Sequence, residues 1–333
     1  MKAIEVQGDW GIDHLAVVEQ PEPVPGPGQI VVAMKAASLN YRDLLTVTGR
    51  GGARLPMIPF SDGAGDVVTV GAGVTRVRQG DRVCPTFFQS WIDGPVTAAK
   101  RASALGGSAP GVLQQRMLLD AEGVTPFPTH LSYLEAATLP CAGLTAWRGL
   151  VDEARIAPGQ WVLIQGTGGV SIFALQFAKA MGCKVVVTSS SDQKLEHARK
   201  LGADVAINYK TTPDWGKAAA KATDGGVDCV IEVGGAETFN QSLDAARVGG
   251  SVVVIGLLSG AAQKIFVPTI FGKNLHIHGI SVGSREQFEA MNAFIARHGL
   301  KPVVDQVYPW LKVQDALKAM QAGAHFGKIC LEF

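Results

Sequence analysis

A glycine-rich turn between a strand and a helix is the segment with the clearest capacity for chemistry. Trp161–Gln165 is a short apolar run typical of a buried strand, Gly166–Ser171 follows directly, and Ile172–Met181 has apolar residues at helical spacing. A second buried strand is predicted at Lys184–Thr188, which completes a strand–helix–strand unit. Because the first turn of a helix offers free N–H groups and a positive dipole end, this spacing predicts a dinucleotide-binding site.

The residues of this turn have separate expected roles. Gly166 permits the tight turn, Gly168 lets the backbone approach a pyrophosphate, and Gly169 keeps the helix close to the strand. Thr167 and Val170 complete the predicted cofactor-binding turn. The alternative interpretation is a glycine turn that serves packing alone.

The end of the second strand indicates which dinucleotide binds. An enzyme that uses NAD places an acid about 20 residues past the glycines, where it accepts a hydrogen bond from the ribose 2′-hydroxyl. Ser189 occupies this position, and the nearby Asp192 is expected to cap the next helix instead. The hydroxyls of Ser189 and Ser190 and the ammonium group of Lys194 suit a 2′-phosphate, so we favour NADP(H) as the cofactor.

Length and composition limit the possible function classes. The chain has 333 residues, which suggests about two domains, and 47% of them are hydrophobic, which is enough for full cores. A net charge of +1 gives no basic footprint for nucleic acid. No apolar run approaches the ~18 residues of a membrane span, and the N-terminal MKAIEVQGDWG has no signal-peptide core. We therefore expect a cytoplasmic protein without a membrane partner.

Cysteine and histidine patterns give no clear metal site. The five cysteines include no C-x-x-C pair, so we expect neither a disulfide framework nor a four-cysteine zinc site. His276 and His278 lie at i and i+2 on one predicted strand and could begin a metal site. No third ligand is visible, so we favour an exposed face or a subunit edge for these histidines.

Many short strands with glycine turns fill the first part of the chain, which is typical of a partly closed β-structure. Two amphipathic helices are predicted near the C-terminus, before a last strand at Ile329–Phe333. The other predicted strands are Met1–Val6, Leu15–Glu19, Ile30–Ala37 and Asp66–Val70, and the predicted helices are Tyr133–Ala137, Ser284–Arg297 and Val313–Ala322.

A set of motifs runs in one order through most of the chain: SLNYRD (38–43), IPFSDGAGDV (58–67), VGAGVTRVRQGDRV (70–83), LPCAGLTAW (139–147), GTGGVS (166–171) and KLGADVAINY (200–209). This order resembles the medium-chain dehydrogenase/reductase superfamily, and within it the zinc-free quinone oxidoreductase-like branch of zeta-crystallin-like NADPH:quinone reductases, which is related to the zinc-type alcohol dehydrogenases. The resemblance implies an α/β fold with two domains and an active site in the cleft between them. Residues 1–124 and 282–333 would form a GroES-like β-barrel catalytic domain, and residues 125–281 a Rossmann domain with a doubly wound parallel sheet.

The resemblance also locates the zinc-ligand positions of metal-dependent members. Their Cys, His and second Cys positions read Asn40, Ser61 and Cys141, of which only the last is a good zinc ligand. Asp62 stands at a family Glu position, but one Cys and one Asp are too few ligands. We therefore expect no metal site and no zinc.

The four-cysteine structural lobe of zinc-dependent members is replaced by Pro85–Gln115, which contains no cysteine. We expect a short helix and loops in this segment. Phe87, Phe88 and Trp91 either line a substrate pocket or pack as an aromatic cluster beneath a loop.

Further contacts follow from the resemblance. Thr145 and Leu257 match positions beside the nicotinamide, Tyr209 suits the 2′-phosphate, and Lys328 matches a basic residue that can approach the cofactor. In relatives the segment at 274–281 pairs across a dimer, so we expect a homodimer through this edge of the Rossmann domain.

Together these residues predict zinc-independent hydride transfer from NADPH to a quinone or an α,β-unsaturated carbonyl compound. The enolate or phenolate oxygen that develops needs hydrogen-bond donors, and Asn40 and Tyr41 are the expected ones, although Tyr41 could serve packing alone. Asp43 matches a family acid, and orienting Asn40 or Arg42 is its plainer role. The rival hypotheses are an alcohol dehydrogenase or carbonyl reductase that acts at C=O, and a non-catalytic NADPH-binding protein.

Overall fold

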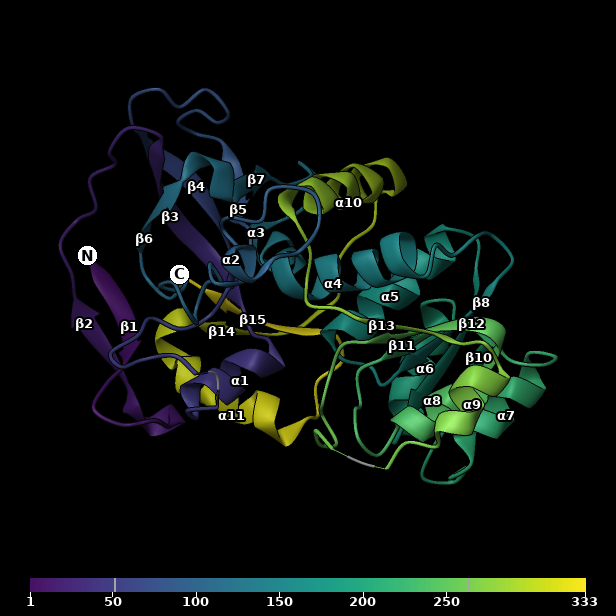
Figure 1. Ribbon diagram of the computed structural model, residues 1–333. Coiled ribbons are helices and arrows are strands. Elements are labelled where there is room, and N and C mark those ends of the chain that lie inside the picture. Colours follow the sequence, from purple (N-terminus) through teal and green to yellow (C-terminus); the bar gives the residue numbers. More distant parts are fainter. Residues whose placement is uncertain (51, 263) are drawn as a thin grey trace. The chain divides into compact units, whose positions relative to one another are not determined.

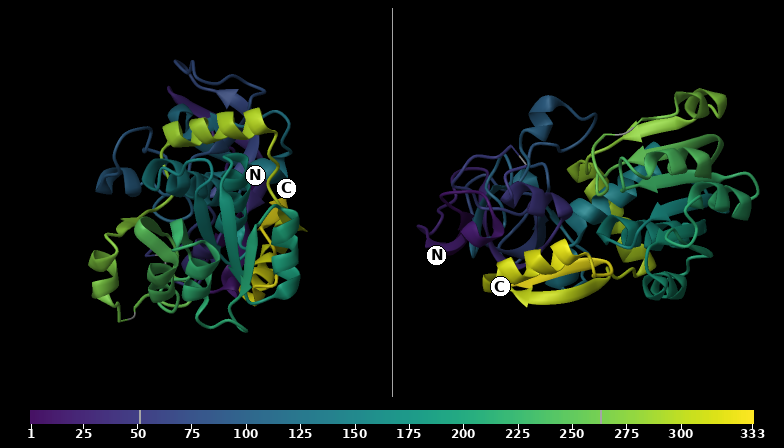
Figure 2. Two further views of the ribbon diagram at one scale, coloured as in Figure 1. Left: turned by 90° about the vertical axis from the view of Figure 1, so that its right-hand side faces the viewer. Right: turned by 90° about the horizontal axis from the view of Figure 1, so that it is seen from below.

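The computed structural model describes residues 1–50, 52–262 and 264–333. The chain divides into two compact units, of which unit 1 comprises residues 1–144 and 282–333 and unit 2 comprises residues 145–281 (Figure 1). Unit 1 is thus built from both ends of the chain. Figure 2 shows its C-terminal strands and helix, in yellow, beside N-terminal elements, in purple.

The boundaries of the units differ in part from the expected domain boundaries. The second boundary lies at 281/282, as expected, but the first lies at 144/145 and not at 124/125. The reason is that β7 (Val124–Pro126) pairs with β5 (Arg82–Pro85), and α3 (Tyr133–Ala136) packs against β3 and β4. The segment after residue 124 therefore completes unit 1 before the chain enters unit 2.

A seven-stranded sheet forms the frame of unit 1, in the order β14-β15-β3-β4-β5-β7, with β6 also paired to β3. One edge of β3 pairs with β4 along nearly its whole length, and the other edge is shared between β6 and β15. Since β4 and β15 are both antiparallel to β3, their first residues lie beside its last ones. The strands of unit 1 outside β5 and β7 are β1 (Lys2–Val6), β2 (Leu15–Glu19), β3 (Gln29–Ser38), β4 (Asp62–Val70), β6 (Arg116–Asp120), β14 (Val304–Pro309) and β15 (Lys328–Glu332).

The fourth strand begins earlier than the sequence suggested. We expected Asp66 to start it, but β4 begins at Asp62. Gly63 and Gly65 lie inside the strand because β3 comes too close for a side chain: a Cβ on Gly65 would lie 2.2 Å from the Ala33 carbonyl oxygen. The glycines therefore allow close strand packing, and they place Asp62 in the sheet.

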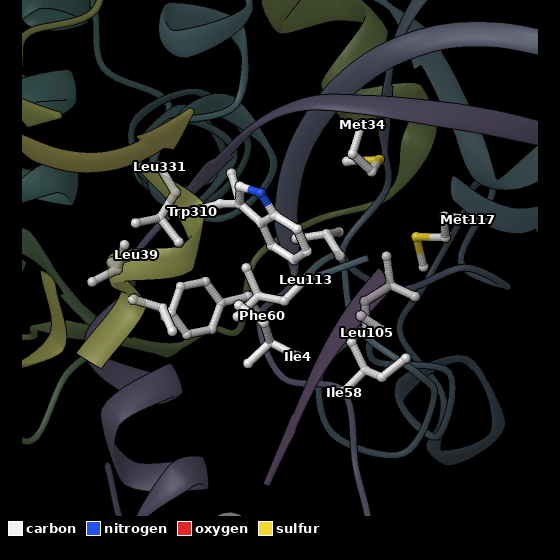
Figure 3. Packing of buried hydrophobic residues seen from close by; sticks show 14 of the residues in the cluster. Ile4, Met34, Leu39, Ile58, Phe60, Leu105, Leu113, Met117, Trp310 and Leu331 are labelled. Carbon is white, nitrogen blue, oxygen red and sulfur yellow. The ribbon is translucent and has the colours of Figure 1, made fainter. Parts of the chain in front are cut away.

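Two helices of unit 1, α1 and α11, contribute buried apolar residues to the core that packs on this sheet. In Figure 3, Ile4, Phe60, Leu113 and Trp310 come from distant parts of the chain and share one core. Apolar burial of this extent is the main source of folding free energy. The helices of unit 1 are α1 (Tyr41–Val47), α2 (Ala98–Arg101), α3, α10 (Arg285–His298) and α11 (Val313–Ala322), with 3-10 turns at 12–14, 121–123 and 310–312 and a π-helical turn at 139–143.

Unit 2 contains a six-stranded parallel sheet in the order β10-β9-β8-β11-β12-β13. Counted along the chain, this order is 3-2-1-4-5-6, so the predicted doubly wound Rossmann sheet is confirmed. The strand order reverses at β8, and dinucleotides bind beyond the carboxyl ends of strands at such a point. The strands are β8 (Trp161–Gln165), β9 (Lys184–Ser189), β10 (Val205–Asn208), β11 (Val227–Glu232), β12 (Ala246–Val254) and β13 (His276–Gly279).

Helices flank these strands, and α5 packs against β8 and β9 while α8 packs against β11 and β12. None of the helices in the described part of the chain has the length and apolar character to cross a membrane. The remaining helices are α4 (Leu144–Arg148), α5 (Gly169–Ala180), α6 (Asp192–Lys200), α7 (Trp215–Ala222), α8 (Phe239–Ala245) and α9 (Val267–Gly272), with a π-helical turn at 149–153.

Candidate functional site

Buried polar side chains gather in unit 1 where β3 ends and where β4 and β15 begin. Asn40 follows β3, Asp62 is the first residue of β4, and Lys328 is the first residue of β15. Ser38, at the end of β3, pairs with Asp62 on one side and Cys330 on the other, which brings these strand ends together. The exposed fractions of Asn40, Asp62 and Lys328 are 8%, 0% and 3%, so each side chain depends on protein partners.

Lys328 reaches into this cluster through its ammonium group. Its Nζ donates hydrogen bonds to Asn40 Oδ1, at 2.6 Å, and to the carbonyl oxygen of Leu39. We expected this lysine to approach the cofactor, whereas within unit 1 its ammonium group contacts the Asn40 amide. The two residues are 288 positions apart in the chain, so only the pairing of β15 with β3 reveals the contact.

Asp43 is fully buried and holds the start of α1. Its Oδ2 accepts a hydrogen bond from the backbone N–H of Asn40 at 2.7 Å, and its Oδ1 lies 3.3 Å from Arg42 Nη1. Burial raises the pKa of the Asp43 carboxyl to about 6, although the positive charge of Arg42 opposes the increase. Asp43 therefore contacts both residues that we expected it to orient.

Asp62 is also fully buried. Its Oδ1 accepts a hydrogen bond from the Ser61 hydroxyl at 2.6 Å, and its Oδ2 accepts one from the backbone N–H of Cys141 at 3.1 Å. Burial raises the pKa of the Asp62 carboxyl, whereas the Lys328 charge, the Ser61 hydroxyl and the Asn40 side chain each lower it. The cluster thus places two carboxyl groups and an ammonium group in a region largely closed to water.

The residues at the metal positions of zinc-dependent relatives do not fit a zinc ion. Asn40 Oδ1 is occupied by Lys328, and the Ser61 hydroxyl donates to Asp62. Burial raises the pKa of the Cys141 thiol far above its usual range, which disfavours the thiolate that zinc binds. Within residues 1–50, 52–262 and 264–333, no three His, Cys, Asp or Glu residues are grouped so that they could hold a metal ion.

Tyr41 differs in exposure from the aromatic residues of 85–115. Its side chain, at the start of α1, is 40% exposed, so packing does not explain it. Phe87, Phe88 and Trp91 are buried, and the ring centroids of Phe87 and Phe88 are 4.6 Å apart, which indicates a packed cluster. The Arg42 guanidinium lies 4.8 Å from the Phe87 centroid, so this cluster supports the residue next to Tyr41.

The glycine-rich turn of unit 2 has the geometry of a phosphate-binding turn. Gly166 has a φ of 68°, a value that favours glycine, and Gly168 is the N-cap of α5. A Cβ added to Gly166 or Gly168 would meet no atom within 4 Å, so open space lies beside this backbone. No side chain caps the helix, and its first N–H groups remain available for a pyrophosphate.

The other residues expected near the cofactor differ in exposure. Thr145 and Thr167 are buried, Val170 is half-buried, and Leu257 is exposed after β12. Leu257 lies against the loop that follows β11, because a Cβ on Gly235 would lie 2.8 Å from its Cα. The loops after β11 and β12 therefore touch at the carboxyl edge of the sheet, where the doubly wound fold binds dinucleotides.

Hydroxyl groups, and no acid, occupy the end of β9. Ser189 ends this strand and is paired in register with Asn208 of β10. The backbone N–H of Tyr209 donates to the Ser189 carbonyl oxygen at 3.1 Å, and the Tyr209 side chain is 41% exposed. Ser190 and Lys194 are partly exposed beside them. The strand end thus gathers the residues that we expected at a 2′-phosphate.

The expected cap of α6 was wrong. Ser191, and not Asp192, is the N-cap, since its hydroxyl accepts a hydrogen bond from the Lys194 backbone N–H at 3.3 Å. Asp192 is the first helical residue, and its carboxylate accepts a hydrogen bond from the Asn208 side chain at 2.8 Å. Its acid group is therefore engaged with the end of β10.

A buried hydrogen-bond network around Glu232 escaped the sequence analysis. Glu232 is fully buried at the end of β11, and Gln165, at the end of β8, is 4% exposed. The available signal was an acid at the end of a largely apolar strand, two residues before Gly234-Gly235. The Glu232 carboxylate accepts hydrogen bonds from Gln165 Nε2 and Thr238 Oγ1, both at 2.6 Å, from the N–H groups of Gly234 and Gly235, both at 2.8 Å, and from the Ser242 hydroxyl.

Comparison with known proteins gives matches over nearly the whole chain. Residues 26–129 match the alcohol dehydrogenase GroES-like domain, and residues 169–297 match the zinc-binding dehydrogenase family. A zinc-type alcohol dehydrogenase-like protein of Schizosaccharomyces pombe is 44% identical over 332 residues, which cover 97% of this chain and 96% of the relative.

Solved structures agree with these matches. A crystal structure of an NAD-dependent alcohol dehydrogenase has 32% identity and a TM-score of 0.91, and the match covers 100% of both chains. The 2-octenoyl-CoA carboxylase reductase CinF, in complex with NADP and 2-octenoyl-CoA, has 26% identity and a TM-score of 0.87, and the match covers 99% of this chain and 87% of CinF. With its GroES-like unit 1 and Rossmann unit 2, the chain belongs to the medium-chain dehydrogenase/reductase superfamily and is an oxidoreductase of the alcohol dehydrogenase-like kind.

Proposed function

We propose that the protein is a zinc-independent, NADPH-dependent reductase of quinones or α,β-unsaturated carbonyl compounds. The observation that carries the proposal is the hydrogen bonding of the Asn40 side chain. This residue occupies a position at which zinc-dependent relatives have a metal ligand. Its Nδ2 is buried and by distance and angle completes no hydrogen bond with a described residue, although the Asn40 side chain lies close enough to Asp62 to lower the pKa of that carboxyl. A buried donor without a partner is costly, so a substrate oxygen is a suitable acceptor for it.

The residues of unit 2 would hold the cofactor. Gly166–Val170 would bind the pyrophosphate, Thr145 and Leu257 would lie near the nicotinamide, and Ser189 would lie near the 2′-phosphate. When bound, NADPH supplies a hydride to the electron-poor carbon of a conjugated substrate. Conjugation makes that carbon electrophilic without a metal ion.

The residues of unit 1 would stabilise the negative charge that develops on the substrate oxygen. Asn40 Nδ2 offers one donor, and the hydroxyl of the exposed Tyr41 side chain offers a second. Oriented donors in a site that excludes water contribute strongly to such reactions, and loss of one typically costs about 100-fold or more in kcat. Asp43 holds the backbone of Asn40 and thereby its position.

The preference for NADPH rests on the end of β9. An NAD-binding site needs an acid there, but Ser189 ends the strand and Asp192 is bonded to Asn208. CinF was solved with NADP, which supports the proposal, whereas the other solved structure is of an NAD-dependent enzyme. The choice between the two cofactors is therefore a direct test of the Ser189, Ser190, Lys194 and Tyr209 assignment.

The runner-up function is an alcohol dehydrogenase or carbonyl reductase that acts at C=O. The names of the relatives favour it, since the yeast protein is described as zinc-type alcohol dehydrogenase-like. This function would need an electrophile that polarises an isolated carbonyl group. It predicts bound zinc and oxidation of simple alcohols, neither of which the proposed reductase requires.

The test is a screen of NADPH oxidation with quinones, enones, enoyl thioesters and aldehydes, with metal content measured on the same sample. Turnover of conjugated substrates by protein that carries far less than one metal ion per chain would support the proposal. Oxidation of simple alcohols by protein with stoichiometric zinc would establish the runner-up. Binding of NADPH without any turnover would indicate a non-catalytic protein.

We also propose that the protein is a homodimer through the edge of unit 2. β13 is the last strand of its sheet, and residues 274–281 therefore offer unpaired backbone groups. Ile277 in this strand and Phe266 and Phe271 nearby in the chain are exposed. Sedimentation equilibrium would show a dimer, and an Ile277→Lys substitution should shift it to monomer.

A further inference from the structure

The buried lysine at the start of β15 has an asparagine side chain as a partner. Lys328 Nζ donates to Asn40 Oδ1 at 2.6 Å and to the Leu39 carbonyl oxygen. The lysine is itself fixed at its backbone, whose N–H donates to the Val303 carbonyl oxygen at 3.0 Å. Its ammonium group is therefore anchored at one place beside α1.

This contact decides which way the Asn40 amide faces. An ammonium group has three N–H donors and no acceptor. If the amide were turned over, its NH₂ group would face the ammonium group of Lys328, donor against donor. The Asn40 oxygen must therefore face Lys328, and Nδ2 must face the opposite way.

The neighbours of Nδ2 leave it free to serve a ligand. The Asp43 carboxylate accepts a hydrogen bond from the Asn40 backbone N–H, which fixes the residue at the start of α1. A side-chain hydrogen bond from Asn40 contributes to lowering the pKa of Asp62, so one N–H of Nδ2 faces this carboxylate, which also accepts hydrogen bonds from Ser61 and Cys141. By distance and angle, Nδ2 completes no hydrogen bond with a described residue, and with two N–H groups it keeps at least one for a ligand.

We infer that Lys328 is a positioning residue that orients the Asn40 amide so that Nδ2 donates a hydrogen bond to the substrate oxygen. This inference rests on the proposed function, in which Asn40 stabilises the developing negative charge. It assigns to Lys328 a role inside unit 1 that differs from contact with the cofactor. The two roles predict different kinetic changes when the ammonium group is removed.

The kinetic test compares wild type, Lys328→Met, Lys328→Arg, Asn40→Ala and the Lys328→Met/Asn40→Ala double variant on one conjugated substrate. Lys328→Met should lower kcat by about 10- to 100-fold with little change in the KM for the substrate, because the donor is misdirected in the transition state. The Kd for NADPH, measured by fluorescence without substrate, should not change. Lys328→Arg, which keeps N–H donors, should recover part of kcat.

The double variant tests whether Lys328 acts through Asn40. It should be no slower than Asn40→Ala alone, since the lysine then has no amide to orient. Multiplied losses in the double variant would overturn the inference. So would a Lys328→Met variant with a higher Kd for NADPH and an unchanged kcat, because that result would identify a cofactor contact.

A half-buried lysine whose ammonium group is also hydrogen-bonded provides the control for stability. Lys273 Nζ donates to the carbonyl oxygens of Leu243, Asp244 and Ala246 in unit 2, so Lys273→Met also removes a bonded ammonium group. It should lower the Tm and leave kcat near the wild-type value. An equal fall in kcat for both variants would overturn the inference, because it would attribute the Lys328→Met effect to lost stability.

A spectroscopic readout separates this inference from the substrate assignment. The chain has five asparagines, so selective ¹⁵N-asparagine labelling gives a sparse set of side-chain NH₂ signals, and Asn40→Ala identifies the Asn40 pair. Lys328→Met should shift or broaden that pair, and Lys328→Arg should partly restore it, even if no tested enone is reduced. Unchanged Asn40 signals in Lys328→Met would overturn the inference, whereas absence of turnover with shifted signals would count only against the proposed function.

Discussion

Both units bury carboxyl groups completely, but they surround them differently. In unit 2, Glu232 accepts hydrogen bonds from side chains at the end of β8 and on and before α8, and from two consecutive backbone N–H groups. In unit 1, Asp43 and Asp62 have fewer neutral donors and lie near Arg42 and Lys328. The first arrangement satisfies a carboxylate with fixed dipoles, and the second leaves its carboxyl groups dependent on nearby cations.

This difference separates a structural site from one suited to chemistry. The donors around Glu232 fix the turn at Gly234–Gly235, so the carboxylate shapes the loop at the cofactor edge of the sheet. Burial raises the pKa values of Asp43 and Asp62, and by distance and angle the Asn40 Nδ2 beside them completes no hydrogen bond with a described residue. Perturbed ionisation together with an unused donor is typical of functional sites.

The largest effect should come from removal of the Glu232 carboxylate. Glu232→Ala leaves several buried donors without acceptors and should lower the free energy of unfolding by roughly 3–5 kcal/mol, as measured by urea denaturation. Glu196→Ala, at an exposed residue of the same unit paired with Arg199, is the matched control and should change stability by less than about 0.5 kcal/mol. Equal stability of the two variants would show that the network has no structural role.

A smaller effect should appear in the pH dependence of unit 1. The native pKa of Asp43 is about 6 against an ordinary value of 3.8, so between these values the native state binds more protons than the unfolded state. Stability should therefore fall as pH rises through this window, by at most about 3 kcal/mol at full ionisation.

Asp43→Asn tests this slope because it resembles the protonated acid. Arg42, Asp62 and Lys328 remain in the variant, so their contributions largely cancel in the comparison. The stability of wild type relative to Asp43→Asn, from urea unfolding at pH 4, 5, 6 and 7, should decrease from low to high pH. A difference that stays constant over this range would mean that Asp43 does not titrate there.

Local sequence signals predicted most of the helices and strands. They failed where the structure depends on a contact with a residue distant in the sequence. The spacing of apolar residues predicted α11 at Val313–Ala322, where the structure has it. The strand was expected to begin at Asp66 and not at Asp62, because nothing local reveals that β3 lies close beside Gly63 and Gly65. Local patterns report periodicity and turns, but they do not report which backbone lies opposite.

In the candidate site, too, contacts between residues close in sequence were predictable and contacts between distant residues were not. Asn40 and Asp43 lie within one turn, so their association was visible in the sequence. The contact between Lys328 and Asn40 joins opposite ends of the chain through strand pairing, and no spacing rule contains it. The Glu232 network likewise joins residues from β8, β11 and α8, and only the acid at the end of β11 gave a signal in the sequence.

A third effect concerns a new carboxylate in unit 2. Ser189→Asp places an acid at the end of β9, where it would repel a 2′-phosphate and accept from a 2′-hydroxyl. The ratio of kcat/KM with NADPH to that with NADH should fall by about 10-fold or more, equivalent to about 1.4 kcal/mol. Ser189→Ala removes the hydroxyl without adding charge and should change the ratio less. An unchanged ratio in Ser189→Asp would contradict the placement of the 2′-phosphate.

The smallest effect should come from metal removal. The carboxyl groups of unit 1 already face the cationic groups of Arg42 and Lys328, and the Asn40 and Ser61 oxygens are engaged by other residues. Dialysis against a chelator should therefore change kcat by less than about 2-fold if no step depends on zinc. The Asn40→Cys/Ser61→His variant is the positive control, because with Cys141 it restores three good zinc ligands. This variant should bind Co²⁺ and show a thiolate charge-transfer band that wild type lacks. If wild type showed the same band and lost its activity on chelation, its catalysis would depend on a metal ion.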